Sequence, residues 1–513
     1  MERLKRLRGR AEPRSEVERP AAANGALRAK NAQLETTVGA LRTEIGQLQA
    51  TVTALRAENS ELRDSVGGQQ SRIAELERQV EQQAAKLATN SRNSSAPPSS
   101  DGPAVPPRRR KKRGLRRGGQ PGHEGATRAL VALAAVDEVV DCRPESCTAC
   151  GALLLGEDAS PERRQIIDVP TPKIIVREYR LHRLICLACG SATKAEAPEG
   201  LPDSVFGVGL HALAALLVGR FRQSKRLVTE LFEVVYGLSI SPGSICAMEQ
   251  RVAAALAEPV EEARAALRRA KVVGKDETGW RLLKAKAWLW VTATDSLAVF
   301  TIARRRSSQI VKQILGEAFA GVVCSDRWSA YTYLLQRQIC WAHLLRDFTA
   351  MSERHRSAWH RQRLAECARR VMAAYAERQA GRISHDEMVR CLVPVRERTR
   401  RLLTWTANSA PGSKAQSMAR EILKLEAHLW TFLDDASIPV TNNLCERLLR
   451  YAVIWRKLSY GCDSEAGARF VERILSVSAS LQLQRRDVFA YLTAAIDAHF
   501  RGQPAPSILP ASS

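Results

Sequence analysis

The chain of 513 residues is longer than one hydrophobic core usually organises, so several domains are expected. Its 78 Lys and Arg outnumber its 54 Asp and Glu, and the formal charge of +24 favours a polyanionic partner, either nucleic acid or an acidic membrane surface. No run of about 18 apolar residues predicts a membrane span, and the 12 mostly scattered cysteines argue against a disulfide framework. The charged N-terminus lacks the apolar core of a secretory signal, so we expect a soluble, cytoplasmic protein without a membrane partner.

Residues 24–89 carry a heptad pattern that predicts a coiled coil. Leucine recurs at every seventh position, namely Leu27, Leu34, Leu41, Leu48, Leu55 and Leu62. The other seam position is mostly β-branched and holds Asn31, Val38, Ile45, Val52, Asn59, Val66, Ile73, Val80 and Leu87. This combination favours a parallel two-stranded coil, and the two asparagines would fix its register. We therefore expect a homodimer or larger assembly, with a break near Gly67. The alternative is one amphipathic helix packed on its own domain.

Residues 90–128 predict a linker followed by a basic segment. The stretch 90–107 is rich in Ser, Pro and Asn, which is typical of linkers. Eight cations follow within ten residues, namely Arg108, Arg109, Arg110, Lys111, Lys112, Arg113, Arg116 and Arg117. Such a run is either a solvated tail or a segment that binds the phosphate backbone of DNA, and the pattern by itself leaves both open.

Two Cys-x2-Cys-Gly motifs in residues 129–200 predict a zinc-ribbon-like module. Their cysteines are Cys147, Cys150, Cys186 and Cys189. Four thiolates suit a closed tetrahedral zinc site with a structural role. The apolar runs 163–170 and 173–185 predict two strands joined by a Pro-containing turn, and such a hairpin would bring the two motifs together. The alternative is two incidental cysteine pairs.

Residues 205–265 are expected to form a helical DNA-binding segment. The runs 210–219 and 224–236 predict two helices, the second ending at Gly237 as a left-handed cap. Ser241 is the predicted N-cap of a third helix, with Pro242 at its first position. This order fits a helix-turn-helix whose third helix contacts bases, although many helical bundles share the pattern.

The pattern changes to strands from about residue 270. Predicted strands cover 271–276, 287–293, 297–302, 321–326 and 338–341, and a predicted helix covers 307–318. Three successive strands, a helix and a fourth strand are the element order of a ribonuclease-H-like α/β domain, and the fold class as a whole is multidomain α+β. We assign this catalytic core to residues 270–347 and 436–500. The intervening residues 348–435, rich in Arg, Ala, Leu and Glu, predict a helical insertion.

Three acids are the candidate metal ligands and catalytic residues. Asp276 follows the first predicted strand and Asp326 ends the fourth, so both carboxylates emerge from one sheet edge if these strands are adjacent and parallel. Glu446 lies in a helix predicted to be capped by Asn443, with Glu446 as its capping-box partner. Hard oxygen ligands of this kind bind Mg²⁺, and two Mg²⁺ ions can support in-line phosphoryl transfer. Alternatively, each acid serves only a turn or a helix dipole.

Asp276 is preferred over adjacent Glu277, since neighbouring strand residues point to opposite faces. Four cations near Glu446, namely Arg447, Arg450, Arg456 and Lys457, either hold DNA phosphates or form a solvated helix face. The segment with Cys340 and His343 has too few ligands for a closed metal site and is interpreted as a packed helix start.

Several of these segments resemble the insertion-sequence-66 family of bacterial transposases. They are SRNSSAPPSSD, GGQPGHEG, the two CxxCG motifs, DETGW, SDRWSAY, CWAHLLRDF and TNNLCERLLR followed by WRK, in family order over roughly residues 90–480. The resemblance implies an Asp-Asp-Glu triad at Asp276, Asp326 and Glu446, a zinc-ribbon-like segment, a helical insertion and small accessory proteins as possible partners. Cys445, where a small residue such as Ala is usual, and Cys462, in a commonly Gly-Ser-rich turn, depart from the family pattern and leave open whether this copy is active.

These observations predict a metal-dependent DNA transposase of a bacterial insertion sequence, associated with the nucleoid. It would cleave the ends of its element and join them to target DNA, using two catalytic Mg²⁺ ions and one structural zinc ion. Two alternatives are a DNA-binding regulator that has lost catalysis and a nuclease that cuts without joining.

Overall fold

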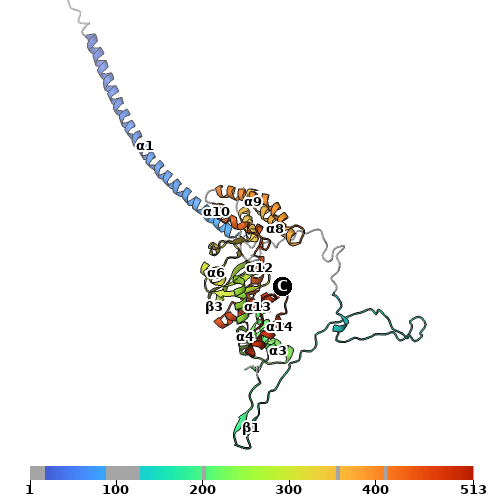
Figure 1. Ribbon diagram of the computed structural model, residues 1–513. Helices are drawn as coiled ribbons and strands as arrows, with labels where there is room; N and C mark the ends of the chain where they lie inside the picture. The colour runs from blue at the N-terminus through green and yellow to red at the C-terminus, as the bar shows by residue number, and fades with distance from the viewer. Residues whose placement is uncertain are drawn as a thin grey trace, which may run out of the picture. The chain divides into compact units, whose positions relative to one another are not determined.

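The computed structural model describes residues 18–87, 128–198, 201, 204–353, 359–409 and 413–511. The chain divides into two compact units, Met1–Thr89 and Asn90–Ser513, which we describe separately (Figure 1). The basic segment from Arg108 to Arg117 lies outside the described residues. Within the described ranges, no helix combines the length and apolarity needed to cross a membrane.

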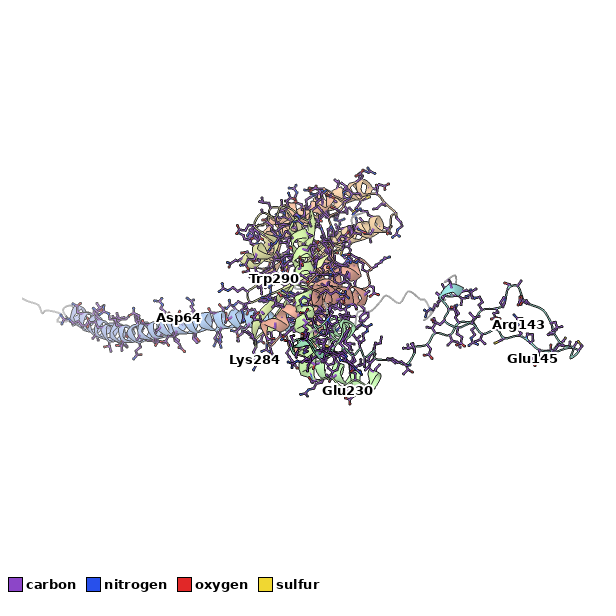
Figure 2. All side chains as sticks on the ribbon, turned by 60° about the horizontal axis from the view of Figure 1, so that its bottom comes forward. Asp64, Arg143, Glu145, Glu230, Lys284 and Trp290 are labelled. Carbon is purple, nitrogen blue, oxygen red and sulfur yellow. The ribbon has the colours of Figure 1, made fainter. Side chains whose placement is uncertain are left out.

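The first unit is one long helix, α1 (Glu18–Leu87). The predicted break near Gly67 is wrong, since the helix continues through it. The heptad leucines are all about half exposed, from 51% at Leu41 to 59% at Leu27 and Leu48. Side chains project from α1 all along its length, as near Asp64 in Figure 2. A helix of this length with a half-exposed leucine seam is compatible with one strand of a coiled coil, and pairing of two such helices stays a prediction.

Residues 128–198 contain little regular structure. A short helix η2 (Leu133–Ala135) and a two-stranded hairpin of β1 (Arg183–Ile185) and β2 (Ala192–Lys194) are present. The strands predicted over 163–170 and 173–185 are wrong except for the last three residues. Apolar side chains there are exposed, with Ile166 and Val176 each at 87%. β-Branched composition alone was not sufficient to predict these strands, because a strand is stable only when it pairs with another strand and has one face covered.

The predicted helical segment is confirmed at the level of secondary structure. It comprises α2 (Val208–Ala215), the π-helical turn η3 (Leu216–Arg220), α3 (Lys225–Tyr236), α4 (Pro242–Ala255) and α5 (Ala257–Arg268). Gly237 caps α3 with φ 62°, and the Ser241 side chain accepts a hydrogen bond from the backbone of Ser244. The inner face of α4 is buried, with Ile245 and Met248 in the core. Base contact by α4 stays a prediction.

A five-stranded sheet forms the centre of the second unit. Its strands are β3 (Val272–Leu282), β4 (Ala285–Ala293), β5 (Ala298–Ala303), β6 (Val322–Ser325) and β7 (Arg337–Ile339), in the order β5-β4-β3-β6-β7. The pairs β3–β4 and β4–β5 are antiparallel, whereas β3–β6 and β6–β7 are parallel. The predicted strand order and the helix between the third and fourth strands, α6 (Ser308–Leu315), are confirmed.

Helix α13 (Glu465–Leu483) covers the edge strand β5 and satisfies its free backbone groups. The side chains of Glu472, Ser476 and Ser480 lie on one face at successive helical turns. They accept hydrogen bonds from the backbone amides of Ile302, Phe300 and Ala298 at 2.6, 2.9 and 3.0 Å, in that order. An edge strand left open would be a template for aggregation, so this helix closes the sheet.

The predicted insertion is helical, but it begins earlier than residue 348. Its elements are α7 (Trp341–Glu353), α8 (Trp359–Gln379), α9 (His385–Asn408), α10 (Lys414–Lys424), α11 (Glu426–Leu429) and η5 (Thr431–Leu433). They enclose a second hydrophobic core, in which Trp341 and Trp430 pack edge-to-face with ring centroids 4.8 Å apart. The chain then returns to the sheet with α12 (Asn443–Ser459), followed by α13 and α14 (Val488–Phe500).

Candidate active site

Asp276 lies within β3 rather than after it. The strand continues past the acid because its antiparallel partner β4 pairs with it as far as Leu282. The parallel partner β6 ends earlier, and its register sets Gly274 opposite Cys324. If this pairing is continued by two residues, Asp276 lies opposite Asp326, the residue that directly follows β6. The predicted adjacency of these two strands and their parallel direction are therefore confirmed.

The two neighbouring acids of β3 point to opposite faces of the sheet. On the face of Gly274 lies α12, so close that a Cβ at Gly274 would be 2.8 Å from the Cys445 sulfur. Asp276 shares this face, because side chains alternate along a strand. Glu277 points to the other face, where Arg306 and Tyr331 contact its carboxylate. This supports the choice of Asp276 over Glu277 as the residue that faces α12.

Glu446 lies in the first turn of α12, but the predicted capping box is wrong. The N-cap is Asn442, and its side chain makes no capping hydrogen bond. Instead the Asn442 amide donates to the carbonyl of Lys275 at 2.9 Å, and its backbone N–H donates to the Cys340 sulfur at 3.2 Å. Asn442 thus anchors the start of α12 beside Asp276, and Glu446 is left without the structural role that the capping box offered.

Two side chains of α7 contact the Glu446 carboxylate, and sequence reasoning missed both. Arg346 donates from Nη2 to Oε1 at 2.9 Å, and His343 Nε2 lies 3.5 Å from the same oxygen. Burial, followed by the nearby charges of Arg346 and Arg327, lowers the pKa of His343 to about 3, so the ring is neutral at pH 7. The i, i+3 spacing of His343 and Arg346 put them on one face of α7, but only the fold brings that face to Glu446.

Burial raises the pKa of Asp276 well above its usual value, and the charges of Glu277, Asp326 and Glu446 raise it further. Mutual repulsion among carboxylates is the condition that a divalent cation relieves, so the donor set suits Mg²⁺ or Mn²⁺. In the described part of the chain, however, no three Cys, His, Asp or Glu side chains are close enough to hold one ion as they stand. Glu446 contacts Arg346 instead.

The cations of α12 divide into two groups. Arg447, Arg450 and Lys457 are exposed. Arg456 is partly buried and donates from Nη1 to the Thr278 hydroxyl at 3.2 Å and to the Gly279 carbonyl. The guanidinium thus fastens α12 to β3, and its role as a phosphate ligand stays a prediction. Arg220 stacks over Tyr451 of α12 at 3.9 Å and adds a further cation to this side of the molecule.

Two sequence models of known families match parts of this chain. The sequence model described as "Transposase IS66 family" matches residues 204–470, just over half of the chain, and this stretch contains Asp276, Asp326 and Glu446. The chain belongs to this family. A second model, a family of unknown function designated DUF6444, matches residues 22–129 and so covers most of α1.

Two curated relatives of this IS66-family chain come from Sinorhizobium fredii. The uncharacterized protein y4hP is 23% identical over 403 residues, which is 69% of this chain and 71% of the relative. The uncharacterized protein y4jD is 25% identical over 400 residues, which is 69% of this chain and 75% of the relative.

The two cysteine motifs of the IS66-family chain form matching turns. The backbone amides of Cys147 and Cys186 donate to the carbonyls of Ala152 and Ser191, both at 2.8 Å. Gly151 and Gly190 close these turns with φ 74° and 70°, which only glycine adopts without strain. Each motif thus presents two thiols, as predicted for a knuckle. The four thiols do not meet in one site among the described residues, so a shared zinc ion stays a prediction.

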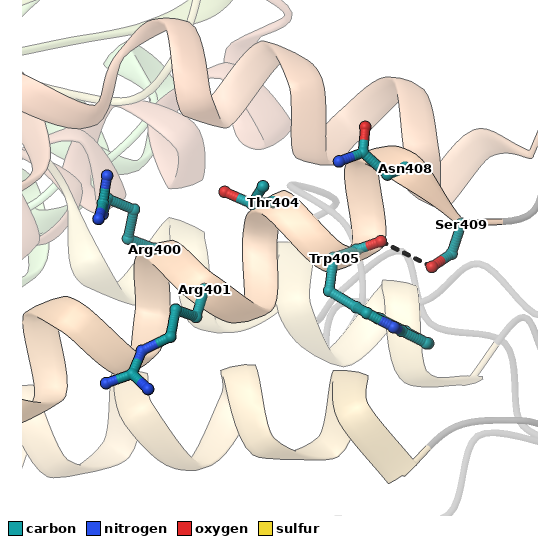
Figure 3. A pocket seen from close by; sticks show the side chains of 6 residues that line it. All are labelled: Arg400, Arg401, Thr404, Trp405, Asn408 and Ser409. Carbon is teal, nitrogen blue, oxygen red and sulfur yellow. Dashed lines mark hydrogen bonds between the residues drawn. The ribbon is translucent and has the colours of Figure 1, made fainter.

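One open pocket of the described surface is lined by residues of α9 and by none of the three acids. It has a volume of 560 Å³ and is formed along α9 by Arg400, Arg401, Thr404, Trp405, Asn408 and Ser409 (Figure 3). An adjoining pocket of 520 Å³ includes Arg396 and Glu397. Glu397 pairs with Arg400 and Arg401 at 3.4 and 3.2 Å, so part of this positive charge is compensated within the helix.

Proposed function

We propose that this chain is a DNA transposase whose Asp276, Asp326 and Glu446 hold two divalent cations for strand cleavage and strand transfer. The observation that carries the proposal is the register of β3 and β6, which sets Asp276 opposite Asp326, with α12, the helix of Glu446, packed on the face of Gly274. Membership of the IS66 family supports the same activity. The pKa of Asp276 is raised first by burial and then by neighbouring carboxylates, and cation binding would relieve the repulsion among these carboxylates.

The sheet supports a ribonuclease-H-like core for this activity. Three antiparallel strands are followed by a helix and two parallel strands, and the first strand β3 lies in the middle of the sheet beside β6. This arrangement carries Asp276 and Asp326 on adjacent strands. Helix α12 follows the helical insertion in the chain. It packs on the face of Gly274 and carries Glu446. We propose the core as residues 270–347 and 436–500, with α7 shared between the core and the insertion.

The chemistry assigned to each residue follows from its position. Asp276 and Asp326 would share one ion, and Glu446 would hold the second with one aspartate. When bound, such cations activate an attacking hydroxyl and neutralise charge on the leaving oxygen during in-line phosphoryl transfer. The exposed Arg447, Arg450 and Lys457 supply positive charge beside the acids for DNA phosphates.

Other parts of the chain would serve DNA binding and assembly. The basic segment 108–117 and the helices of residues 205–265 would bind the element ends and target DNA, and α1 would form a homodimer that brings two ends together. Residues 129–200 would fold around one structural zinc ion. Small accessory proteins of the same element would be further partners, and the protein would associate with the nucleoid.

The test is the variant Asp276→Asn in the full chain, assayed with labelled element ends and Mg²⁺ or Mn²⁺. We expect cleavage and joining to fall by at least about 100-fold, because one of the two aspartate ligands of the shared ion loses its charge. Binding of the DNA ends should stay within about twofold of the wild-type protein. Glu465→Gln is a matched control, since it removes an exposed carboxylate that pairs with Arg304 on another part of the surface.

Three outcomes discriminate the candidate functions. Wild-type activity in Asp276→Asn would refute the assignment of the triad. A wild-type protein that binds ends and cuts nothing with either metal would favour a regulator, and one that cuts without joined products would favour a nuclease.

A further inference from the structure

Glu277, the acid beside Asp276, is the centre of a buried network on the opposite face of the sheet. Its side chain is only 2% exposed. One carboxylate oxygen accepts from Arg306, at 2.8 Å from Nε and 2.6 Å from Nη2. The other accepts from the Tyr331 hydroxyl at 2.7 Å. Both oxygens of a nearly inaccessible carboxylate are therefore engaged, which is how a buried charge is retained.

The partners of Glu277 lead to the segment that carries Asp326. Tyr331 ends the short helix η4 (Ser329–Tyr331), which begins three residues after Asp326. Arg306 stacks over Trp328 at 4.0 Å, and Trp328 packs edge-to-face on Tyr331 with ring centroids 5.7 Å apart. The backbone N–H of Trp328 in turn donates to the Asp326 carboxylate at 3.0 Å.

The same network reaches Asp276 through the backbone of β3. The N–H of Glu277 donates to the Asp276 carboxylate at 2.9 Å. Each aspartate therefore accepts a backbone hydrogen bond from a residue of the network, Glu277 in one case and Trp328 in the other. The parallel pairing of β3 and β6 ends at Gly274 and Cys324, so no ladder hydrogen bond ties the segments together at the level of the acids. The network provides that connection.

We propose that Glu277 is a positioning residue that clamps the segment 326–331 to β3 and thereby fixes the distance between the carboxylates of Asp276 and Asp326. This inference rests on the proposed function of the two aspartates as ligands of a shared ion. Two carboxylates on separate segments bind one cation well only if their spacing is held before the ion arrives. The segment has other contacts as well: Arg337 donates to the Asp326 carbonyl at 3.2 Å, Arg327 pairs with Asp347 at 2.7 Å, and Trp328 packs on Trp290 of β4 with ring centroids 5.8 Å apart.

A purely electrostatic role for Glu277 is the competing explanation. Its negative charge lies near the site and would attract a cation without any clamp. Tyr331→Phe separates the two explanations, because it removes one hydrogen bond of the clamp and leaves the Glu277 charge in place. Glu277→Gln removes the charge but retains the shape of the side chain.

The experiment measures Mn²⁺ binding to the full chain by titration calorimetry, with Mn²⁺ as the only ligand, and single-turnover cleavage of labelled element ends. We expect Tyr331→Phe and Glu277→Gln each to weaken Mn²⁺ binding by about three- to tenfold, and to slow cleavage without changing the affinity for DNA. A role in folding alone would lower the melting temperature and leave Mn²⁺ affinity unchanged. Glu465→Gln is again the control, since it breaks an ion pair of Arg304, two residues from Arg306, outside the network.

The outcomes separate this inference from the proposed function. Unchanged Mn²⁺ affinity and cleavage in Tyr331→Phe, with loss of both in Asp276→Asn, would overturn the clamp and leave the triad in place. Weakened binding in Glu277→Gln alone would also overturn it and favour the electrostatic role. If Asp276→Asn itself bound Mn²⁺ like the wild-type protein, the proposed function would fail first.

Discussion

Arg346 holds the Glu446 carboxylate through a 2.9 Å hydrogen bond from Nη2 to Oε1. The two residues come from different helices, α7 and α12, and are 100 positions apart in the chain. The guanidinium lies where it neutralises the acid that we assign to the second cation. A cation and Arg346 therefore compete for the same oxygen.

Arg346→Met should strengthen Mn²⁺ binding to the full chain. The substitution removes the competing charge and keeps an apolar side chain of similar length. A charge-assisted hydrogen bond of a partly exposed pair is expected to contribute on the order of 1 kcal/mol, which corresponds to roughly five- to tenfold in affinity. Titration calorimetry checks the change.

The control for this prediction is Lys457→Met, which removes an exposed cation of α12 that no described contact joins to Glu446. It should leave Mn²⁺ affinity within about twofold, since exposed charges are largely screened at physiological salt. Equal effects in both variants would mean that net charge, and not the specific contact of Arg346, governs metal binding.

Gly274→Ala should destabilise the protein and disturb Glu446 together. An added Cβ would lie 2.8 Å from the Cys445 sulfur and 3.0 Å from Asn442 Oδ1, so α12 must move away from β3. Overpacking of this kind costs about 1–3 kcal/mol. We expect a lower melting temperature by a few degrees and slower cleavage, because Glu446 directly follows Cys445.

Gly279→Ala is the comparison for that variant. Its nearest atom would be Arg456 Nη1 at 3.3 Å, the far end of a flexible side chain. The melting temperature of Gly279→Ala should fall less than that of Gly274→Ala. Adding Cys445→Ala to Gly274→Ala should recover part of the lost stability. Equal melting temperatures for the two alanine variants would contradict the close approach of α12.

Local signals in the sequence predicted much of this fold. β-Branched and aromatic runs identified all five strands of the sheet, and Gly237 and Ser241 marked helix ends correctly, because a left-handed cap and an N-cap depend on residues within one turn. The sequence predicted that Asp276 and Asp326 lie at one edge of the sheet if their strands are adjacent and parallel, and β3 and β6 meet this condition.

Contacts between residues far apart in the chain could not be predicted from these local signals. Asn442 follows the rule for an N-cap residue, yet its side chain binds the carbonyl of Lys275, 167 residues away. Arg346 and His343 reach Glu446 only because the insertion folds back on the sheet. The predicted strands of residues 163–185 had the right composition, but no described segment pairs with most of them. In each case the decisive partner lies far along the chain.

The full chain should contain about one zinc ion, bound by both cysteine motifs. Structural zinc sites with four thiolates bind tightly enough to persist through purification, since the binding free energy is about 10–16 kcal/mol. Cys147→Ser and Cys186→Ser should each lose the ion, as measured by elemental analysis. Cys142→Ser, outside both motifs, should retain it. Full zinc content in Cys186→Ser would show that the motifs do not share one site.

Zinc should also organise the residues between the motifs. The side chains of Ile166 and Val176 are each 87% exposed where a hairpin was predicted. Drawing the two knuckles together would bring these apolar runs side by side, because metal binding and folding are coupled in such modules. Circular dichroism of the full chain before and after chelation should therefore report a loss of strand signal.

Leu41→Glu combined with Leu48→Glu should convert an assembled protein into a monomer. Both leucines belong to the α1 seam and are 51% and 59% exposed in the single chain. Burying a leucine contributes about 1.5–3 kcal/mol, and in a parallel dimer each substitution instead sets two carboxylates against each other. Light scattering at micromolar concentration measures the mass.

The matched control is Thr43→Glu combined with Ala50→Glu, which adds the same charges to the same two heptads on the outer side of the helix. This variant should keep the mass of the wild-type protein, because outer positions of a coiled coil face water. A monomeric wild-type protein, or a seam variant that stays assembled, would remove α1 as the dimerisation element. Pairing of two element ends would then require another interface. If the seam variant instead cleaves single ends but yields no joined products, α1 supplies the interface that pairs the ends.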